Sequence, residues 1–144
     1  MASDTAAIQS AIDACASQGG GTVYFPPGKY LTGTLVWKSQ VTLHLEAGAT
    51  LLGSPRREDY GPNFLLYAEN GESLTLTGRG TIDGQGVNHW TWSQEHDRYV
   101  ANEWRPRALI HLVRCKNISI AGIQLANSPC YPLWPLGCES VHIH

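Results

Sequence analysis

A short apolar–polar–apolar phrase recurs along the chain. It occupies residues 43–45, 74–76, 118–120 and 141–143, so successive copies begin 31, 44 and 23 residues apart. Each copy has the alternation of a half-buried strand, and a glycine follows three of the four within a few residues. Periods of about 20 to 50 residues are typical of solenoids, in which each repeat forms one turn of a stacked coil. The pattern therefore predicts stacked β coils over about residues 22–144.

The first segment has a helical period instead. Apolar residues spaced i, i+3 and i+4 predict an amphipathic helix over about residues 4–18, capped by Asp4 and ended by the glycines at 19–21. These apolar residues are Ala7, Ile8, Ala11, Ile12 and Cys15. Such a helix is expected to cover the first coil, because an open end exposes unpaired backbone groups. The alternative is a helix packed on the flank of another kind of β domain.

Aligned copies of the phrase predict which side chains stack in the interior. The alignment places Leu43 over Leu74, Leu45 over Leu76, Leu51 over Ile82 and Gly53 over Gly84. Aliphatic residues then point inward in each coil. Two longer segments interrupt the rhythm, residues 54–63 and an inserted loop at about 85–105. Long loops on a rigid scaffold commonly carry function.

Two cysteines add information on the register. Cys115 and Cys138 each lie three residues before a copy of the phrase, and Gly71 holds that place one coil earlier. They are predicted to stack at the inter-strand spacing of about 4.8 Å. We favour an inward-facing column of small residues, with a disulfide between the two as the alternative. The four cysteines of the chain form no C-x-x-C pair that would indicate zinc.

Composition narrows the choice of partners. The chain has 144 residues, 42% of them hydrophobic and 15% charged, which suits one domain. A net charge of −2 without a basic stripe argues against nucleic acid and anionic membranes as partners. No apolar run of about 18 residues and no secretion signal is visible. The location therefore stays open between extracellular, periplasmic and cytoplasmic.

Several phrases resemble the N-terminal part of glycoside hydrolase family 28, the polygalacturonases. They are residues 4–13, 19–28, 41–54, 78–86 and 127–129. The resemblance implies an all-β, right-handed parallel β-helix with an N-terminal capping α-helix. Because the fourth phrase breaks off at His144, we expect this solenoid to be truncated at its C-terminal end, and its open end to favour self-association. The implied partner is an acidic polysaccharide or oligosaccharide.

The resemblance also implies where catalysis lies. Family members hydrolyse α-1,4 links between galacturonic acid units with inversion, using Asn-Thr-Asp, Asp-Asp, Gly-His-Gly and Arg-x-Lys motifs that follow the coil at which this chain stops. Asn-Thr-Asp, Asp-Asp and Gly-His-Gly do not occur between Met1 and His144. Inverting hydrolysis needs two carboxyl groups held across the sugar ring. We therefore expect an enzyme fragment with no catalytic residue, cofactor or metal of its own. The rival hypothesis is a non-catalytic β-helix module for polysaccharide binding or adhesion.

The inserted loop carries candidate substrate-binding residues. Trp90, Trp92 and Trp104 offer flat apolar faces to sugar rings. Arg105 and Arg107 have the planar fork that pairs with a uronate carboxylate. The alternative is that these tryptophans pin the loop to the coil.

A second group of candidates follows residue 130. Tyr131 and Trp134 lie where the resemblance implies a coil facing the substrate cleft, and Trp134 stands where many family members have a histidine before the proline. Packing over an irregular turn is the alternative role. Asp83, beside Gly84, is predicted to cap a turn rather than to act in catalysis. His142 and His144 supply at most half of a metal site, and we expect both to be solvated.

Overall fold

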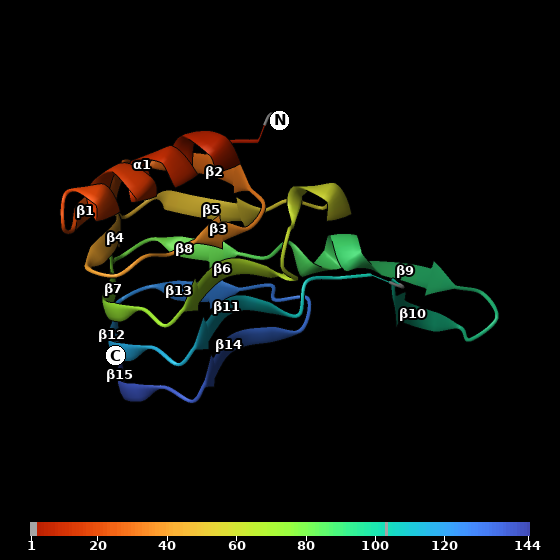
Figure 1. Cartoon of the computed structure of the whole chain (residues 1–144). Coiled ribbons are helices and arrows are strands. Elements are labelled where there is room, and N and C mark those ends of the chain that lie inside the picture. The colour runs from red at the N-terminus through yellow and green to blue at the C-terminus, as the bar shows by residue number, and fades with distance from the viewer. Residues whose placement is uncertain (1–2, 103) are drawn as a thin grey trace.

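The computed structural model describes residues 3–102 and 104–144 as a right-handed parallel β-helix of three sheets (Figure 1). The predicted fold class is thus confirmed. The first sheet contains β1 (Gly21–Phe25), β4 (Val41–Leu45), β7 (Glu72–Gly78), β12 (Lys116–Ile120) and β15 (Glu139–Ile143). The second contains β2 (Gly28–Thr32), β5 (Ala49–Gly53), β8 (Thr81–Asp83) and β13 (Gln124–Ala126). The third contains β3 (Leu35–Val36), β6 (Phe64–Glu69), β11 (Ala108–Val113) and β14 (Tyr131–Leu136).

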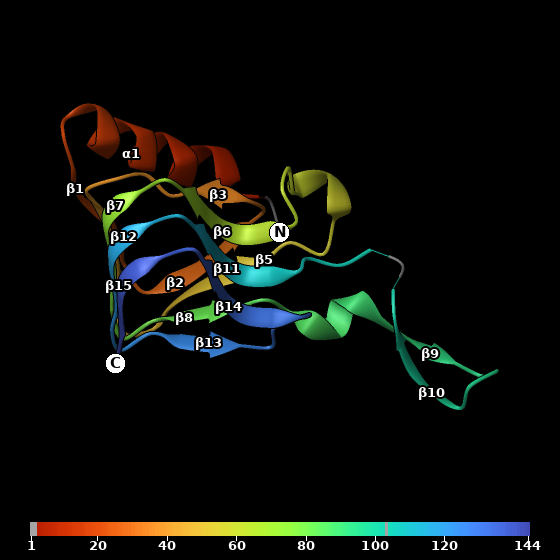
Figure 2. The same cartoon turned by 60° about the horizontal axis from the view of Figure 1, so that its bottom comes forward.

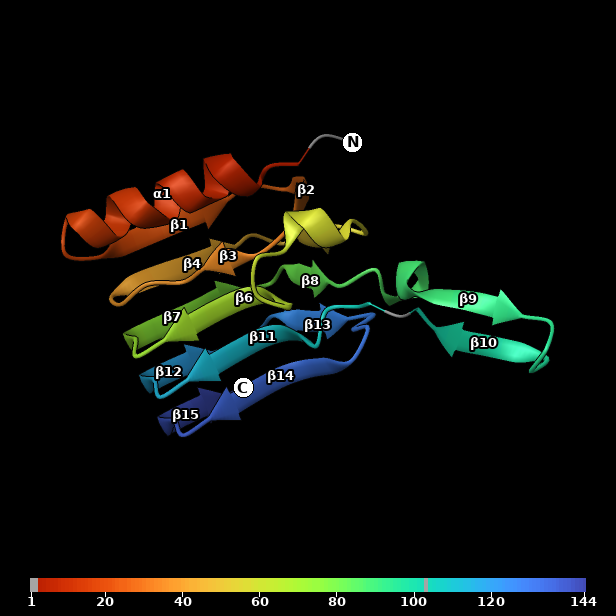
Figure 3. The ribbon, with the colours of Figure 1, turned by 45° about the vertical axis from the view of Figure 1, so that its right-hand side comes forward.

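Helix α1 (Thr5–Ser17) lies across the first coil at one end of the stack (Figures 1 and 3). Ile8 and Ile12 are buried, as the apolar stripe predicts. Asp4 is the N-cap residue, but its side chain makes no capping hydrogen bond. Instead, the Thr5 amide donates to Ser3 Oγ at 3.3 Å. None of the described helices is long and apolar enough to cross a membrane.

The predicted register between the second and third coils is wrong by two residues in the first sheet. Leu43 pairs with Leu76 rather than Leu74, and Leu45 pairs with Gly78 rather than Leu76. In the second sheet, Leu51 pairs with Ile82 as predicted. A register shift of two residues keeps every side chain on the same face of the sheet, because successive side chains of a strand point to opposite faces. The interior therefore remains aliphatic.

The cause of the slip is a shorter corner in the later coil. In the earlier coil, the three residues 46–48 form the corner between β4 and β5. In the later coil, Gly78 pairs with Leu45 and Thr81 pairs with Thr50, so the corresponding corner consists of Arg79 alone, between Gly78 and Gly80. Gly78 makes this tight corner possible, because it has a φ of +114° and a Cβ there would clash with the Leu45 carbonyl. The amides of Arg79 and Gly80 both donate to Leu45 O, at 2.9 and 3.1 Å.

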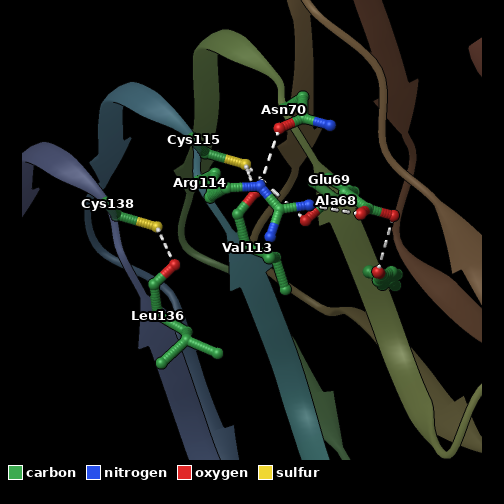
Figure 4. A network of polar contacts seen from close by, with 9 residues as sticks. Ala68, Glu69, Asn70, Val113, Arg114, Cys115, Leu136 and Cys138 are labelled. Atoms are coloured by element: carbon green, nitrogen blue, oxygen red, sulfur yellow. Dashed lines mark hydrogen bonds and ion pairs between the residues drawn. The ribbon is translucent and has the colours of Figure 1, made fainter.

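Cys115 and Cys138 lie in equivalent positions of neighbouring coils, as predicted. The Lys116 amide donates to Gly71 O at 2.9 Å, and the Glu139 amide donates to Cys115 O at 3.0 Å. Both thiols are free, and each points toward backbone carbonyls of the third sheet (Figure 4). Cys115 Sγ lies 3.4 Å from Val113 O and is fully buried. The interpretation as a small apolar column holds.

The segment at 85–105, expected as an inserted loop, contains regular structure. It begins with the 3₁₀ turn η2 (Gly86–His89), followed by an antiparallel hairpin of β9 (Trp90–Ser93) and β10 (Arg98–Ala101). The hairpin extends away from the coil (Figure 2). The other long connection, residues 54–63, contains the 3₁₀ turn η1 (Arg57–Asp59). Both connections lead from the second sheet to the third, so they emerge on the same side of the solenoid.

Candidate functional site

The outer face of the third sheet carries a column of aromatic rings. Tyr67, His111 and Trp134 are direct partners on β6, β11 and β14, so their side chains follow one another across the sheet. The ring centroid of His111 lies 5.8 Å from that of Tyr67 and 4.3 Å from that of Trp134. His111 Nδ1 is also 2.8 Å from the Trp134 carbonyl oxygen, which fixes the orientation of the imidazole. We call these three residues the aromatic column.

Two further rings extend this surface. The Phe64 centroid lies 4.2 Å from that of His111, and the Tyr131 centroid lies 5.8 Å from that of Trp134. His111 is only 6% exposed, whereas Tyr131 is 53% exposed. The column is therefore packed at its centre and open to solvent toward Tyr131 and the half-buried Trp134.

One arginine lies beside the column and a second lies beside Trp90 of the hairpin. The Arg107 guanidinium is 5.8 Å from the Trp134 ring centroid, and that of Arg105 is 5.1 Å from the Trp90 ring centroid. Both are cation–π contacts, which hold the guanidinium planes near aromatic faces. The two arginines also line one cavity of about 350 Å³, the arginine pocket. Its lining consists of Asn63, Ala101, Asn102, Trp104, Arg105, Arg107 and Cys130.

The arginine pocket has two guanidinium groups in its described lining. No Asp or Glu belongs to its lining among the residues that the structure describes. Neither Arg105 nor Arg107 appears in an ion pair within that part of the chain. Among the described lining residues, these two guanidinium groups are thus the charged groups.

Trp104 anchors the base of the hairpin. Its indole Nε1 donates to Asn63 Oδ1 at 3.0 Å, and its ring lies 5.2 Å from Tyr60 and 5.9 Å from His89, measured between centroids. This is the pinning role that the sequence left open, although Trp104 also forms a wall of the arginine pocket. Trp92 is 48% exposed and packs against Tyr99 across the hairpin.

Of the seven candidate substrate-binding residues, five lie at the arginine pocket or the aromatic column. They are Trp104, Arg105, Arg107, Tyr131 and Trp134. Trp90 joins them through Arg105, whereas Trp92 contacts Tyr99 instead. Their role in substrate binding remains a prediction.

His89 is a buried titratable group next to this site. It is 2% exposed, and its Nε2 has no hydrogen-bond partner among the described residues. Burial lowers the pKa of the imidazole, and the positive charge of Arg105 lowers it further. The imidazole packs against Trp104, with ring centroids 5.9 Å apart.

Sequence reasoning missed several members of the site. Tyr67 and His111 are outward-facing positions within otherwise apolar strands, and Asn63 ends a polar loop. An alignment of residues 64–69, 108–113 and 131–136 on their apolar positions is the signal that would have found the column. The recurring phrase drew attention to the first sheet instead.

Two carboxylates, Glu69 on the third sheet and Asp83 on the second, are engaged in structural contacts. Glu69 accepts from Arg114 Nη2 at 2.6 Å and from the Tyr67 hydroxyl at 3.1 Å (Figure 4). Asp83 Oδ1 accepts from the Gln85 amide at 2.8 Å and from Asn127 Nδ2 at 3.1 Å, which confirms its turn-capping role. Neither carboxylate faces a second one in these contacts.

The Arg-x-Lys spacing used by glycoside hydrolase family 28 has one match, Arg114 to Lys116. Arg114 is bound to Glu69 and to Asn70 Oδ1, the latter at 3.1 Å, so it is held at a turn of the coil. His142 and His144 are exposed. Within the described ranges, no three His, Cys, Asp or Glu side chains come together as metal ligands.

The coil geometry places the chain among the right-handed parallel β-helix proteins. A solved exopolygalacturonase from Thermotoga maritima has this architecture and superposes with a TM-score of 0.81. The two sequences are 24% identical, and the match covers 99% of this chain and 42% of that one. The chain belongs to the family described as rhamnogalacturonase A/epimerase, pectate lyase-like, whose model matches residues 1–130.

Two curated relatives show the range of proteins that share these coils. A probable polygalacturonase from Vitis vinifera is 30% identical over 162 residues, which cover 97% of this chain and 32% of that protein. The plasmin and fibronectin-binding protein A of Streptococcus pneumoniae is 38% identical over 98 residues, 58% of this chain and 13% of that protein. The chain thus spans about a third of the length of the first relative and less of the second.

Proposed function

We propose that this chain forms the N-terminal coils and part of the cleft wall of a polygalacturonase-like glycoside hydrolase acting on galacturonan-type pectic polysaccharide. The observation that carries the proposal is the arginine pocket beside the aromatic column, with Arg107 shared between them. The polygalacturonases among the similar proteins support the choice of substrate class.

The chemistry of the pocket suits a uronate. A guanidinium binds a carboxylate through two parallel hydrogen bonds, and Arg105 and Arg107 supply two such groups in one cavity without a competing acid in its described lining. Tyr131 and Trp134 offer apolar ring faces beside it. A chain of acidic sugars would place carboxylates on the arginines and the apolar sides of its rings on the aromatic residues.

Hydrolysis belongs to residues outside this chain under the proposal. Inverting glycosidases hold their two carboxyl groups about 6.5–9.5 Å apart to admit a water molecule. Glu69 and Asp83 are bound to an arginine and to a turn, respectively, and the arginine pocket has no carboxylate in its described lining. The coils described here would bind and orient the polysaccharide.

The test is binding of trigalacturonate to arginine variants. Arg107→Ala and Arg105→Ala should each weaken binding about ten-fold at low ionic strength, because each removes one charged partner of a carboxylate. Arg98→Ala is the matched control, since Arg98 is exposed on β10 and the same charge is lost. Equal weakening by all three variants would show that net charge alone attracts the ligand and would contradict the proposal.

A second candidate is a non-catalytic β-helix module for polysaccharide binding or adhesion. The similarity to plasmin and fibronectin-binding protein A favours it. The two candidates separate in an assay of the full-length protein that contains these coils. Release of reducing ends from polygalacturonate supports the first, and adhesion without release of reducing ends supports the second.

A further inference from the structure

A second pocket lies on the outer face of the second sheet, at the ends of β2 and β5 and between η1 and η2. Its volume is about 380 Å³, within the size range of ligand sites. Leu31, Leu52, Asp59, Gln85 and Asn88 belong to its lining. It shares no lining residue with the arginine pocket.

The floor of this pocket is an apolar pair. Leu31 and Leu52 are direct partners in the sheet, and both are half-buried. The neighbouring outward column is polar, with Lys29, Thr50 and Thr81 in line. Two leucine side chains at the inter-strand spacing of about 4.8 Å form a flat apolar patch similar in length to a pyranose ring. The C–H face of a sugar fits such a patch.

The rim offers groups that bind hydroxyls. One oxygen of Asp59 accepts from the Ser54 hydroxyl, which leaves Oδ1 without a partner among the described residues. Gln85 lines the pocket and its Nε2 donates to Gly53 O at 2.7 Å, whereas its Oε1 has no hydrogen-bond donor among the described residues. Asn88 accepts a hydrogen bond through its backbone carbonyl, but its side-chain amide has no hydrogen-bond partner within the described part of the chain. These three groups combine donors and acceptors as a polyol requires.

The rim is also preorganised. Gln85 has a left-handed backbone with φ of 49°, and its amide is held by Asp83 Oδ1 at 2.8 Å. Its side chain is held by the hydrogen bond from Nε2 to Gly53 O, so it loses little conformational freedom on binding. The turn-capping role of Asp83 therefore also positions a pocket residue.

Charge decides which sugars fit. Arg56 lines the pocket, but its guanidinium is paired with Glu58 Oε1 through Nε at 3.1 Å and Nη2 at 3.0 Å. Among the described lining residues, the remaining charge is the Asp59 carboxylate, which repels a uronate. We propose that this pocket binds a neutral pyranose sugar and excludes an acidic one. The site is independent of the proposed galacturonan-binding surface.

Galactose and galacturonic acid form a matched pair of probes, because they differ only at carbon 6. In amide-resolved NMR titrations of the chain, galactose should shift the signals of Leu52, Gln85 and Asn88, and galacturonic acid should not. Asn88→Ala should weaken galactose binding about five-fold through the loss of one or two hydrogen bonds. Thr50→Ala, on the polar column of the same strand, should leave the affinity unchanged.

Two results would overturn the proposal. One is that galacturonic acid shifts the same three signals as strongly as galactose. The other is that galactose shifts none of them up to its solubility, or binds Asn88→Ala and the parent chain equally well. Arg107→Ala should not alter galactose binding, so a failure of the galacturonan proposal leaves this test unaffected.

Discussion

At the scale of single residues, Trp104 and Trp92 show how one residue type serves two purposes in the same hairpin. Trp104 donates to Asn63 and packs on Tyr60, whereas Trp92 is half exposed and contacts only the neighbouring strand's Tyr99 among its aromatic contacts. Trp104 is therefore an anchor, because it makes contacts beyond the hairpin. Trp92 is a surface residue, because it is exposed and packs within the hairpin.

Trp104→Ala should lower the free energy of unfolding by about 2 kcal/mol, since it removes a half-buried ring and one hydrogen bond. Trp92→Ala should change it by less than about 0.5 kcal/mol, as is usual for exposed sites. Urea denaturation of the two variants measures both values. Equal losses in the two variants would contradict the anchoring role of Trp104.

His89 predicts a dependence of stability on pH. Burial and Arg105 lower its pKa in the folded state below the ordinary 6.5. The unfolded chain therefore binds more protons as the pH falls below about 6.5, and the free energy of unfolding decreases until the pH is below the folded pKa. Urea denaturation at pH 7.5, 6.5 and 5.5 should show this decrease.

His89→Phe removes the titrating group and should flatten this dependence. His96→Phe is the control, because His96 is exposed in the hairpin turn. A parent chain whose stability falls no more steeply than that of His89→Phe would show that His89 does not titrate as described.

Some residue roles follow from local rules and others do not. The turn-capping Asp83 and the column of Cys115 and Cys138 are predictable, because both depend on neighbours in sequence or on the repeat. The Nε2 of His89, without a partner among the described residues, is not predictable, since the imidazole is covered by Trp104, which lies 15 residues further along the chain.

At the scale of elements, the corner after β7 determines how two coils fit together. The close approach of Gly78 to the Leu45 carbonyl shortens the corner and shifts the register of the first sheet. Gly61, by contrast, lies in a loop with nothing near its Cβ position.

Gly78→Ala should destabilise the chain by more than about 2 kcal/mol, because the methyl group meets backbone and the φ is unfavourable for alanine. Gly61→Ala should remain within about 0.5 kcal/mol of the parent. Thermal or urea denaturation distinguishes the two. A tolerated Gly78→Ala would argue against the shortened corner and hence against the observed register.

Periodicity predicts the helix and the strands because each buries one face. It does not predict the hairpin of β9 and β10, because the strands of this hairpin have no buried face and its turn has no glycine. Its sequence is therefore similar to that of an irregular loop. It also misses the register, because a recurring phrase does not reveal how many residues the intervening corner needs.

At the scale of the whole molecule, the solenoid brings distant residues to one side. Tyr60, Trp104 and Cys130 lie on three successive connections into the third sheet, and the arginine pocket forms where these connections meet. The repeat predicts the solenoid, whereas the pocket depends on the lengths and folds of its insertions.

A polypeptide of these 144 residues should self-associate at high concentration. β14 and β15 are edge strands, and Tyr131, Leu136 and Ile143 on them are more than half exposed. Light scattering should show a mass that rises with concentration, and Ile143→Lys should reduce the increase. A strictly monomeric chain would contradict this prediction.

Under the proposed function, these coils bind acidic polysaccharide without hydrolysing it. The most direct measurement follows polygalacturonate binding and the release of reducing ends in one sample of the 144-residue chain. We expect saturable binding that Arg107→Ala weakens about ten-fold, with no release of reducing ends above the blank. Sustained release by the chain alone, or binding that Arg107→Ala leaves unchanged, would contradict it.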